Sequence, residues 1–275
     1  MRLACRGVDI TYDDTGSGAD TVVLLHGLGS ARSTWDPLVA SVAQRARVQA
    51  VDQRGHGDSS HAPGTYTLAH YVADAITVCD TVTDPPVVMV GHSLGAVVAA
   101  SAARLRPDLV RGVMLEDPPL YRGDPQQNPA VAFFAMLRQV TLDMQARHAG
   151  VDDYEALLRV VPSPNGAGSF ADVLGPHGTR ARAQSLATID PEVFAPVADG
   201  SGLDGVQPDA TLACPVRVLR ADPSLGAAFT DADEARFRIS NPHAHIEVVQ
   251  GASHFVHDEQ PERFLAEVHA FLDSL

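Results

Sequence analysis

Lysine is absent from this sequence of 275 residues, so all 20 of its basic residues are arginines. Aspartate and glutamate together number 34, and the formal net charge at pH 7 is −14. An acidic surface repels phosphate backbones and anionic lipid headgroups. We therefore expect no nucleic-acid partner and no membrane association.

Long apolar runs are missing too. No stretch reaches the ~18 apolar residues of a membrane span, and the opening MRLACRGVDI lacks the apolar core of a signal peptide. Cysteine is scarce, because only Cys5, Cys79 and Cys214 are present, far apart and odd in number. That suits free thiols in a reducing compartment better than a disulfide framework. We expect a cytoplasmic protein, and its oligomeric state stays open.

What the sequence does contain is an alternation of apolar strands and helical patterns. Strands are expected at 2–5, 10–13, 21–25, 48–51, 87–90, 110–115, 216–219 and 246–249. Helices are expected at 33–43, 68–82, 96–105, 231–239 and 261–272. Repeated strand–helix units predict an α/β fold, in which a mostly parallel sheet is flanked by helices on both faces.

The alternation stops in the middle of the chain, where residues 118–212 show helical stretches and no clear strand. The segment is too long for a loop of a compact domain. We predict that 118–212 forms an inserted helical lid, and that 1–117 and 213–275 form the core domain. Within the lid, Phe133, Phe134 and Leu137 are candidates to line an apolar substrate pocket, or to pack the lid on the core.

A nucleophile motif follows the expected strand at 87–90, where the chain reads Gly91-His92-Ser93-Leu94-Gly95. Gly-x-Ser-x-Gly between a strand and a helix is typical of a sharp turn that holds the serine in a strained conformation. The two glycines remove side chains that would clash there. A helix N-terminus beside the hydroxyl favours a developing negative charge. Ser93 is therefore the predicted nucleophile.

Four segments together resemble the α/β-hydrolase superfamily, and most of all its small lid-bearing bacterial serine esterases and lactonases. They are VVLLHGLGSARSTW (22–35), VDQRGHGDSS (51–60), VVMVGHSLGAVVAA (87–100) and GASHFVHDEQPERFL (251–265). The resemblance covers nearly the full length, although no motif covers the lid. It implies the α/β-hydrolase fold and serine chemistry that requires no cofactor and no metal.

The resemblance also implies the partners of Ser93. The oxyanion formed during acyl transfer would be held by the backbone amides of Leu28, in the HGLG turn, and of Leu94, which follows the nucleophile. The general base would be His254, which follows the last expected strand and precedes an apolar residue. His257 is the rival base.

The acid that orients the base is ambiguous, because two strand ends can supply it. Asp117 follows the strand before the lid, the position that some lid-bearing relatives use. Asp222 follows the strand after the lid, near the position that most of the superfamily uses. Glu116 is a further candidate beside Asp117. We favour Asp117, with Asp222 as the alternative.

The activity expected from these residues is hydrolysis of a carboxylic ester or lactone of a small, largely apolar substrate through an acyl-enzyme on Ser93. Because the turn carries serine where some relatives carry aspartate, dehalogenase and epoxide-hydrolase chemistry are disfavoured. Two alternatives stay open. One is C–C bond hydrolysis or elimination by the same triad, and the other is a ligand-binding receptor on a hydrolase fold.

Overall fold

The computed structural model describes residues 1–121, 128–163 and 168–275. The two intervening segments, 122–127 and 164–167, belong to the expected lid and lie outside the described residues. Eight strands form one sheet in the order β1-β2-β4-β3-β5-β6-β7-β8. Their bounds are β1 Arg2–Cys5, β2 Val8–Thr15, β3 Thr21–Leu25, β4 Arg47–Val51, β5 Val87–His92, β6 Val110–Glu116, β7 Val216–Ala221 and β8 His245–Val249.

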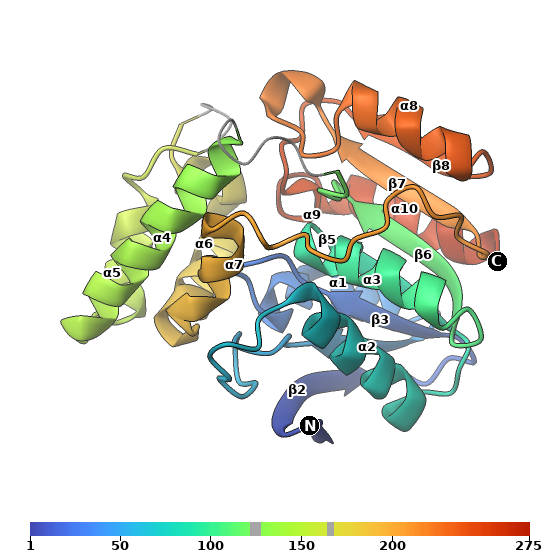
Figure 1. Ribbon diagram of the computed structural model, residues 1–275, viewed down its shortest axis with the longest axis horizontal. Helices are drawn as coiled ribbons and strands as arrows, with labels where there is room; N and C mark the ends of the chain where they lie inside the picture. The colour runs from blue at the N-terminus through green and yellow to red at the C-terminus, as the bar shows by residue number, and fades with distance from the viewer. Residues whose placement is uncertain (122–127, 164–167) are drawn as a thin grey trace.

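The sheet is antiparallel only at one edge, where β2 pairs with β1 and with β4. All other neighbours are parallel, so the carboxyl ends of β3 to β8 share one edge of the sheet (Figure 1). The predicted mostly parallel sheet flanked by helices is thereby confirmed. Ser93, Asp117, Asp222 and His254 each follow the end of one of these strands, and Glu116 is the last residue of β6.

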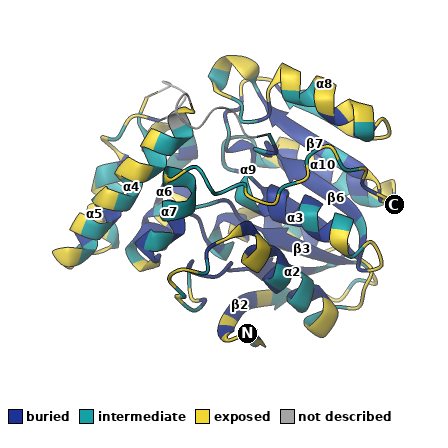
Figure 2. Cartoon of the chain, viewed as in Figure 1, coloured by how far each residue is buried: buried dark blue, intermediate teal, exposed yellow. Residues whose placement is uncertain are grey.

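Helices cover both faces of the sheet, and the strands are buried between them (Figure 2). Val22 and Leu24 of β3 belong to a core with α1 (Asp36–Val42) and α10 (Pro261–Asp273). Val23 and Leu25 belong to the opposite core, with α2 (Leu68–Val82), α3 (Leu94–Leu105) and α8 (Asp231–Ser240). Neighbouring residues of a strand point to opposite faces, so an uninterrupted apolar run is what two covered faces require.

The helix expected at 33–43 is divided into a short 3-10 helix, η1 (Arg32–Trp35), and α1. Pro37 lies in the first turn of α1, where its missing N–H costs no hydrogen bond. A second 3-10 helix, η3 (Pro223–Leu225), follows β7, and a single helical turn, α9 (Val256–Glu259), precedes α10.

Between β6 and β7 the described chain is helical. The elements are α4 Pro129–Ala146, α5 Val151–Leu158, α6 Phe170–Thr188, η2 Pro191–Phe194 and α7 Ala195–Ala198. They lie together beside the carboxyl edge of the sheet (Figure 1). The first turn of α6 ends at Gly175, whose φ of 66° breaks the helix before Pro176. The described part of this segment contributes no strand to the sheet.

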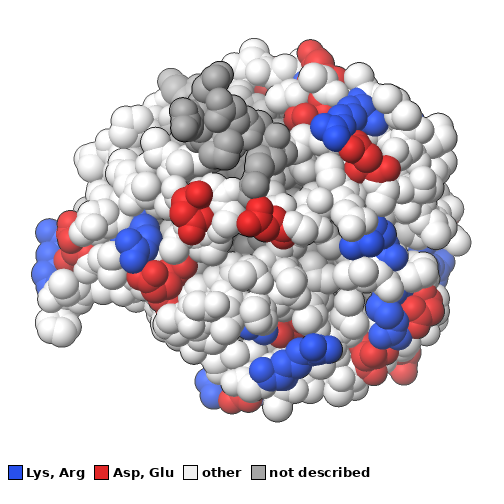
Figure 3. Space-filling model, in the orientation of Figure 1, with Lys and Arg blue, Asp and Glu red and all other residues white. Residues whose placement is uncertain are grey.

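The described surface carries many ion pairs, and on the face shown in Figure 3 arginine side chains lie beside aspartate and glutamate. Across 1–121, 128–163 and 168–275, no helix has the length and apolar character to cross a membrane.

Candidate active site

The turn from β5 to α3 places Ser93 at the carboxyl edge of the sheet with φ 51° and ψ −113°. A Cβ on Gly95 would lie 2.1 Å from the carbonyl oxygen of Leu25, and one on Gly91 would lie 2.3 Å from the carbonyl oxygen of Gly95. Real Cβ atoms do not approach backbone so closely, so both positions require glycine. The amide of Ser93 donates to the carbonyl of Glu116 at 3.0 Å, which ties this turn to the end of β6.

Asp117 is the candidate acid that contacts the candidate base. Its Oδ2 lies 2.6 Å from Nδ1 of His254, and its side chain is fully buried, whereas that of His254 is 26% exposed. The backbone N–H of Ala228 also donates to Oδ2, at 2.8 Å. The N–H groups of Ala221 and Phe229 donate to Oδ1 at 3.3 and 3.2 Å. Four donors therefore fix this carboxylate.

Asp222, the alternative acid, binds the loop after β8 and its own turn and does not contact His254. Its carboxylate accepts hydrogen bonds from the amide of Gly251 at 2.9 Å and from the amide and hydroxyl of Ser224. These bonds are the largest cause of a lowered pKa for Asp222. The structure brings Asp117, and not Asp222, to His254, although both strand ends were open from the sequence.

Glu116 and His257, the other acid and base candidates, pair with each other in the core. The ring and backbone N–H groups of His257 both donate to Glu116, at 2.8 and 2.9 Å. Nε2 of the same ring lies 2.8 Å from the hydroxyl of Thr34, and Trp35 packs on the ring with centroids 4.5 Å apart. Burial lowers the pKa of His257, but the charges of Glu116 and Asp258 outweigh burial and raise it. This buried pair ties α9 to the end of β6.

His92 lies between the nucleophile turn and the candidate base. Its Nε2 donates to the backbone carbonyl of His254 at 2.8 Å, and the two ring centroids are 4.7 Å apart. Burial first, and then the neighbouring imidazoles, lower the pKa of His92 well below its usual range, so the ring is neutral. The hydroxyl of Ser93 forms no hydrogen bond to the His254 ring in this structure. Such bonds are often long before substrate binds.

Of the two predicted oxyanion donors, Leu28 lies in the HGLG turn and Leu94 directly follows Ser93. A Cβ on Gly27, the residue before Leu28, would lie 3.2 Å from Cβ of Ser93, so the HGLG turn and the nucleophile turn are in close approach. Leu94 is the first residue of α3, where backbone N–H groups have no partner within the helix. Among the described residues, neither amide donates to an acceptor.

Two buried histidines hold the HGLG turn. His26 donates from Nδ1 to the carbonyl of Gly27 at 2.8 Å and accepts at Nε2 from the amide of Gln53 at 3.1 Å. His56 accepts at Nε2 from the amide of Gly29 at 3.3 Å and donates from Nδ1 to the carbonyl of Arg54. Burial lowers the pKa of His26 to about 4 and that of His56 to about 3, so both rings are neutral.

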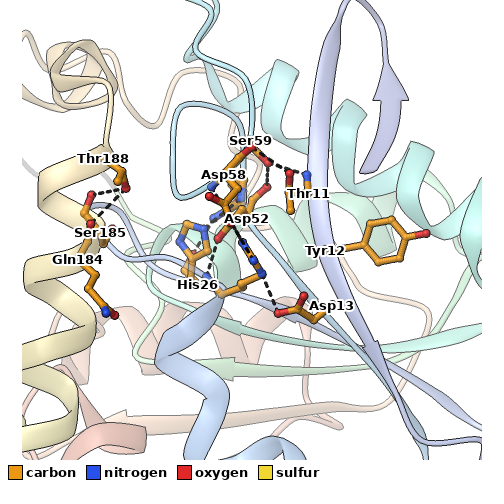
Figure 4. Close-up of polar contacts among 12 residues, drawn as sticks. Thr11, Tyr12, Asp13, His26, Asp52, Asp58, Ser59, Gln184, Ser185 and Thr188 are labelled. Atoms are coloured by element: carbon orange, nitrogen blue, oxygen red, sulfur yellow. Dashed lines mark hydrogen bonds and ion pairs between the residues drawn. The ribbon is translucent and has the colours of Figure 1, made fainter. Parts of the chain in front are cut away.

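The loop after β4 is braced by a buried carboxylate, Asp52, which Figure 4 shows at the centre of a polar network. Asp52 accepts from the backbone amides of Arg32 at 2.7 Å and Asp58 at 2.9 Å, and from the Arg32 guanidinium. Arg32 also pairs with Asp13 and Asp58. The network joins β2, the loop after β4 and the start of η1, the element that follows the HGLG turn in the chain.

Aromatic rings lead from the helical segment to the candidate base. Phe133 of α4 lies 5.9 Å from the ring of Phe170, which lies 6.0 Å from that of Phe255, which lies 5.4 Å from His254. Phe134 packs instead on Phe194 of η2, at 5.8 Å. Leu137, like both α4 phenylalanines, is half-buried and packs against the core. Phe170 and Phe255 were not among the sequence candidates, because an isolated phenylalanine carries no positional signal.

Metal-binding and redox groups are not assembled in the described residues. No cluster of three histidine, cysteine or carboxylate side chains in the described ranges could hold a metal ion. Cys5, Cys79 and Cys214 are free and buried, and burial raises the pKa of each thiol.

The chain is similar to known proteins over nearly its full length. A sequence model described as the alpha/beta hydrolase family matches residues 22–267. The chain is 28% identical to a 2-(acetamidomethylene)succinate hydrolase of Mesorhizobium japonicum, over 97% of this chain and 92% of that protein. It is also 28% identical to the mouse (Mus musculus) sn-1-specific diacylglycerol lipase ABHD11, over 97% of this chain and 86% of that protein.

Among solved structures, the enol-lactonase of Burkholderia xenovorans LB400 superposes with a TM-score of 0.78 at 21% sequence identity. The match covers 99% of this chain and all of the lactonase. At that identity the likeness shows the shared fold.

Proposed function

The chain belongs to the alpha/beta hydrolase family, and from that premise we propose that it is a serine hydrolase that cleaves a carboxylic ester or lactone of a small molecule. The observation that carries the proposal is the contact of 2.6 Å between His254 and the buried carboxylate of Asp117, on loops beside a strained Ser93 with φ 51°. The sn-1-specific diacylglycerol lipase among the similar proteins supports an ester substrate.

The proposed mechanism follows from the hydrogen bonds of His254. A carboxylate can only accept, so Nδ1 of His254 carries the proton that faces Asp117, and Nε2 is the basic nitrogen. Nε2 takes the proton of Ser93 as its oxygen attacks the substrate carbonyl. The oxyanion is held by the amides of Leu28 and Leu94. The leaving alcohol receives the proton from Nε2, and water then releases the acid by the reverse steps.

The helices of 118–212 are proposed as a lid over this site, on a core of 1–117 and 213–275. Phe133 approaches His254 through Phe170 and Phe255, which supports an apolar lining on the lid side of the site. A mostly apolar lining with a few polar groups at the reacting centre is usual in enzymes that bind small molecules.

The test is hydrolysis of a panel of short and medium esters and aromatic lactones by wild type and Ser93→Ala. We expect turnover by wild type and a loss of about 10⁵–10⁶-fold in the variant. Ser240→Ala, at the end of α8, is the matched control. An active Ser93→Ala variant would refute the serine mechanism. Failure of the wild type on every ester and lactone would redirect the search to C–C bonds and to binding without turnover.

A further inference from the structure

Arg182 of α6 points a positive charge at the candidate site. Its Nη1 donates to the backbone carbonyl of Leu28 at 3.2 Å. Its guanidinium carbon lies 5.3 Å from the ring centroid of Phe255, the residue after His254. Figure 4 shows this part of α6, with Gln184 labelled two residues after Arg182, near the loops that carry His26 and Asp52. The guanidinium thus lies between the proposed oxyanion turn and the loop of the proposed base.

The charge of Arg182 has no carboxylate partner in the described part of the chain. Among those residues, every other buried or half-buried arginine except Arg104 forms an ion pair. The one hydrogen-bond acceptor of Arg182 among them is a neutral carbonyl. Since a guanidinium offers five N–H donors, most of its hydrogen-bonding capacity remains for a ligand.

Partial burial makes the unpaired charge of Arg182 unfavourable when no ligand is bound. Burial lowers the pKa of Arg182, and the charge of Asp258 only partly offsets it. Asp258 does not form an ion pair with Arg182. Its carboxylate lies under Gly178, one turn earlier on α6, and 3.6 Å from Nε2 of His257. The side chain of Arg182 is half-buried, and an incompletely paired, partly desolvated cation is typical of a site whose counter-charge arrives with the substrate.

We propose that Arg182 binds an anionic group of the substrate, so that the enzyme acts on esters or lactones that carry a carboxylate close to the scissile carbonyl. The inference rests on the proposed function and narrows its substrate class. A planar guanidinium matches a carboxylate in a two-point contact, and the Phe255 ring limits its orientation. The apolar remainder of the substrate would contact Phe133 and Phe170.

The experiment compares a matched pair of esters, monoethyl succinate and diethyl succinate, by the rate of proton release. The measured quantity is the ratio of kcat/KM for the anionic ester to that for the neutral ester. We expect wild type to prefer the anionic ester. We expect Arg182→Met to lower the ratio about 10- to 100-fold, the loss of one or two hydrogen bonds to a charged group. Arg182→Lys should keep part of the preference, because it keeps the charge.

Arg180→Met is the matched control, since Arg180 is an exposed arginine on the same helix that pairs with Asp152 and Glu155. An unchanged ratio in Arg182→Met, with both rates reduced equally, would mean that Arg182 only supports the fold, and would overturn the inference. A wild type that prefers the neutral ester would overturn it as well.

Direct binding separates this inference from the proposed function. Glutarate binding to wild type, Arg182→Met and Arg182→Lys is measured by calorimetry, with a neutral diester as the reference ligand. If wild type hydrolyses no ester but binds glutarate and Arg182→Met does not, the ester chemistry fails and the anion site stands. If the enzyme hydrolyses esters but shows neither anion preference nor glutarate binding, the anion site fails and the chemistry stands.

Discussion

Replacing Asp117 by asparagine tests the choice between the two candidate acids, and the structure indicates how the amide would settle. One orientation places the NH₂ group at the Oδ1 position, facing the N–H groups of Ala221 and Phe229, and leaves two donors unpaired. The other places it at the Oδ2 position, where only the N–H of Ala228 is left unpaired, because His254 can shift its proton and accept. The second orientation therefore has the lower free energy, because it leaves fewer buried N–H groups without an acceptor.

The favoured orientation has a catalytic consequence. With the asparagine NH₂ donating to Nδ1, His254 carries its proton on Nε2 and can no longer accept that of Ser93. We expect kcat to fall about 10⁴-fold, as for a serine hydrolase whose histidine is held in the wrong tautomer. One unpaired buried donor costs about 1–3 kcal/mol, so Asp117→Asn should remain folded. The backbone of Asp117 has a φ of 39°, a left-handed conformation that asparagine tolerates well.

Initial rates on the best ester of the panel, together with urea unfolding of the same samples, check both expectations. Asp222→Asn is the matched control and should change kcat less than about threefold, because Asp222 contacts Gly251 and Ser224 and not the base. A folded Asp117→Asn variant with more than about a tenth of wild-type activity, or a large loss in Asp222→Asn, would refute the assignment.

Two further predictions concern stability. Gly95→Ala would place a Cβ 2.1 Å from the carbonyl oxygen of Leu25, so it should lower the Tm measured by calorimetry by about 4–10 °C. Gly150→Ala is the control and should leave the Tm nearly unchanged, because its Cβ would meet nothing closer than 3.9 Å. The second concerns pH: burial lowers the pKa of His26 to about 4 and that of His56 to about 3. Below about pH 6.5 the unfolded chain therefore binds more protons than the folded chain does. The free energy of unfolding should fall as the pH drops from about 6.5 to 4, by about 3 kcal/mol for His26 alone. Equal stability by urea unfolding at pH 7 and pH 4.5 would contradict it.

The sequence predicted the sheet and the nucleophile turn because both depend on local patterns. Short apolar runs such as 21–25 and 87–90 are typical of strands in a parallel sheet that is covered by helices on both faces. The steric need for Gly91 arises within the motif itself, against the carbonyl of Gly95, whereas Gly95 must also pass close to the carbonyl of Leu25 at the end of β3. The spacing of the two glycines between a strand and a helix is nevertheless a local pattern. The proposed lid, by contrast, was predicted from the absence of a strand pattern in 118–212, and the described part of that segment is helical.

The sequence favours Asp117 as the candidate acid but leaves Asp222 open, and no pattern in it points to Arg182. Asp117 and Asp222 both follow parallel strands, and what distinguishes them is where Ala221, Ala228 and Phe229 direct their N–H groups. Arg182 stands 154 residues from Leu28 in the chain, within a helix whose pattern gives no sign of a ligand. Both facts arise only when the loops at the carboxyl edge of the sheet are packed together.

The proposal that His254 is the base is strengthened by what the other site histidines do. Both ring nitrogens of His26, His56 and His257 are engaged by hydrogen bonds, and all three rings are almost fully buried. His92 is buried as well, and its Nε2 is engaged by the carbonyl of His254. His254 alone among these five combines partial exposure, 26% of its side chain, a carboxylate on one nitrogen, and a second nitrogen with no partner among the described residues. That second nitrogen is the one a general base needs.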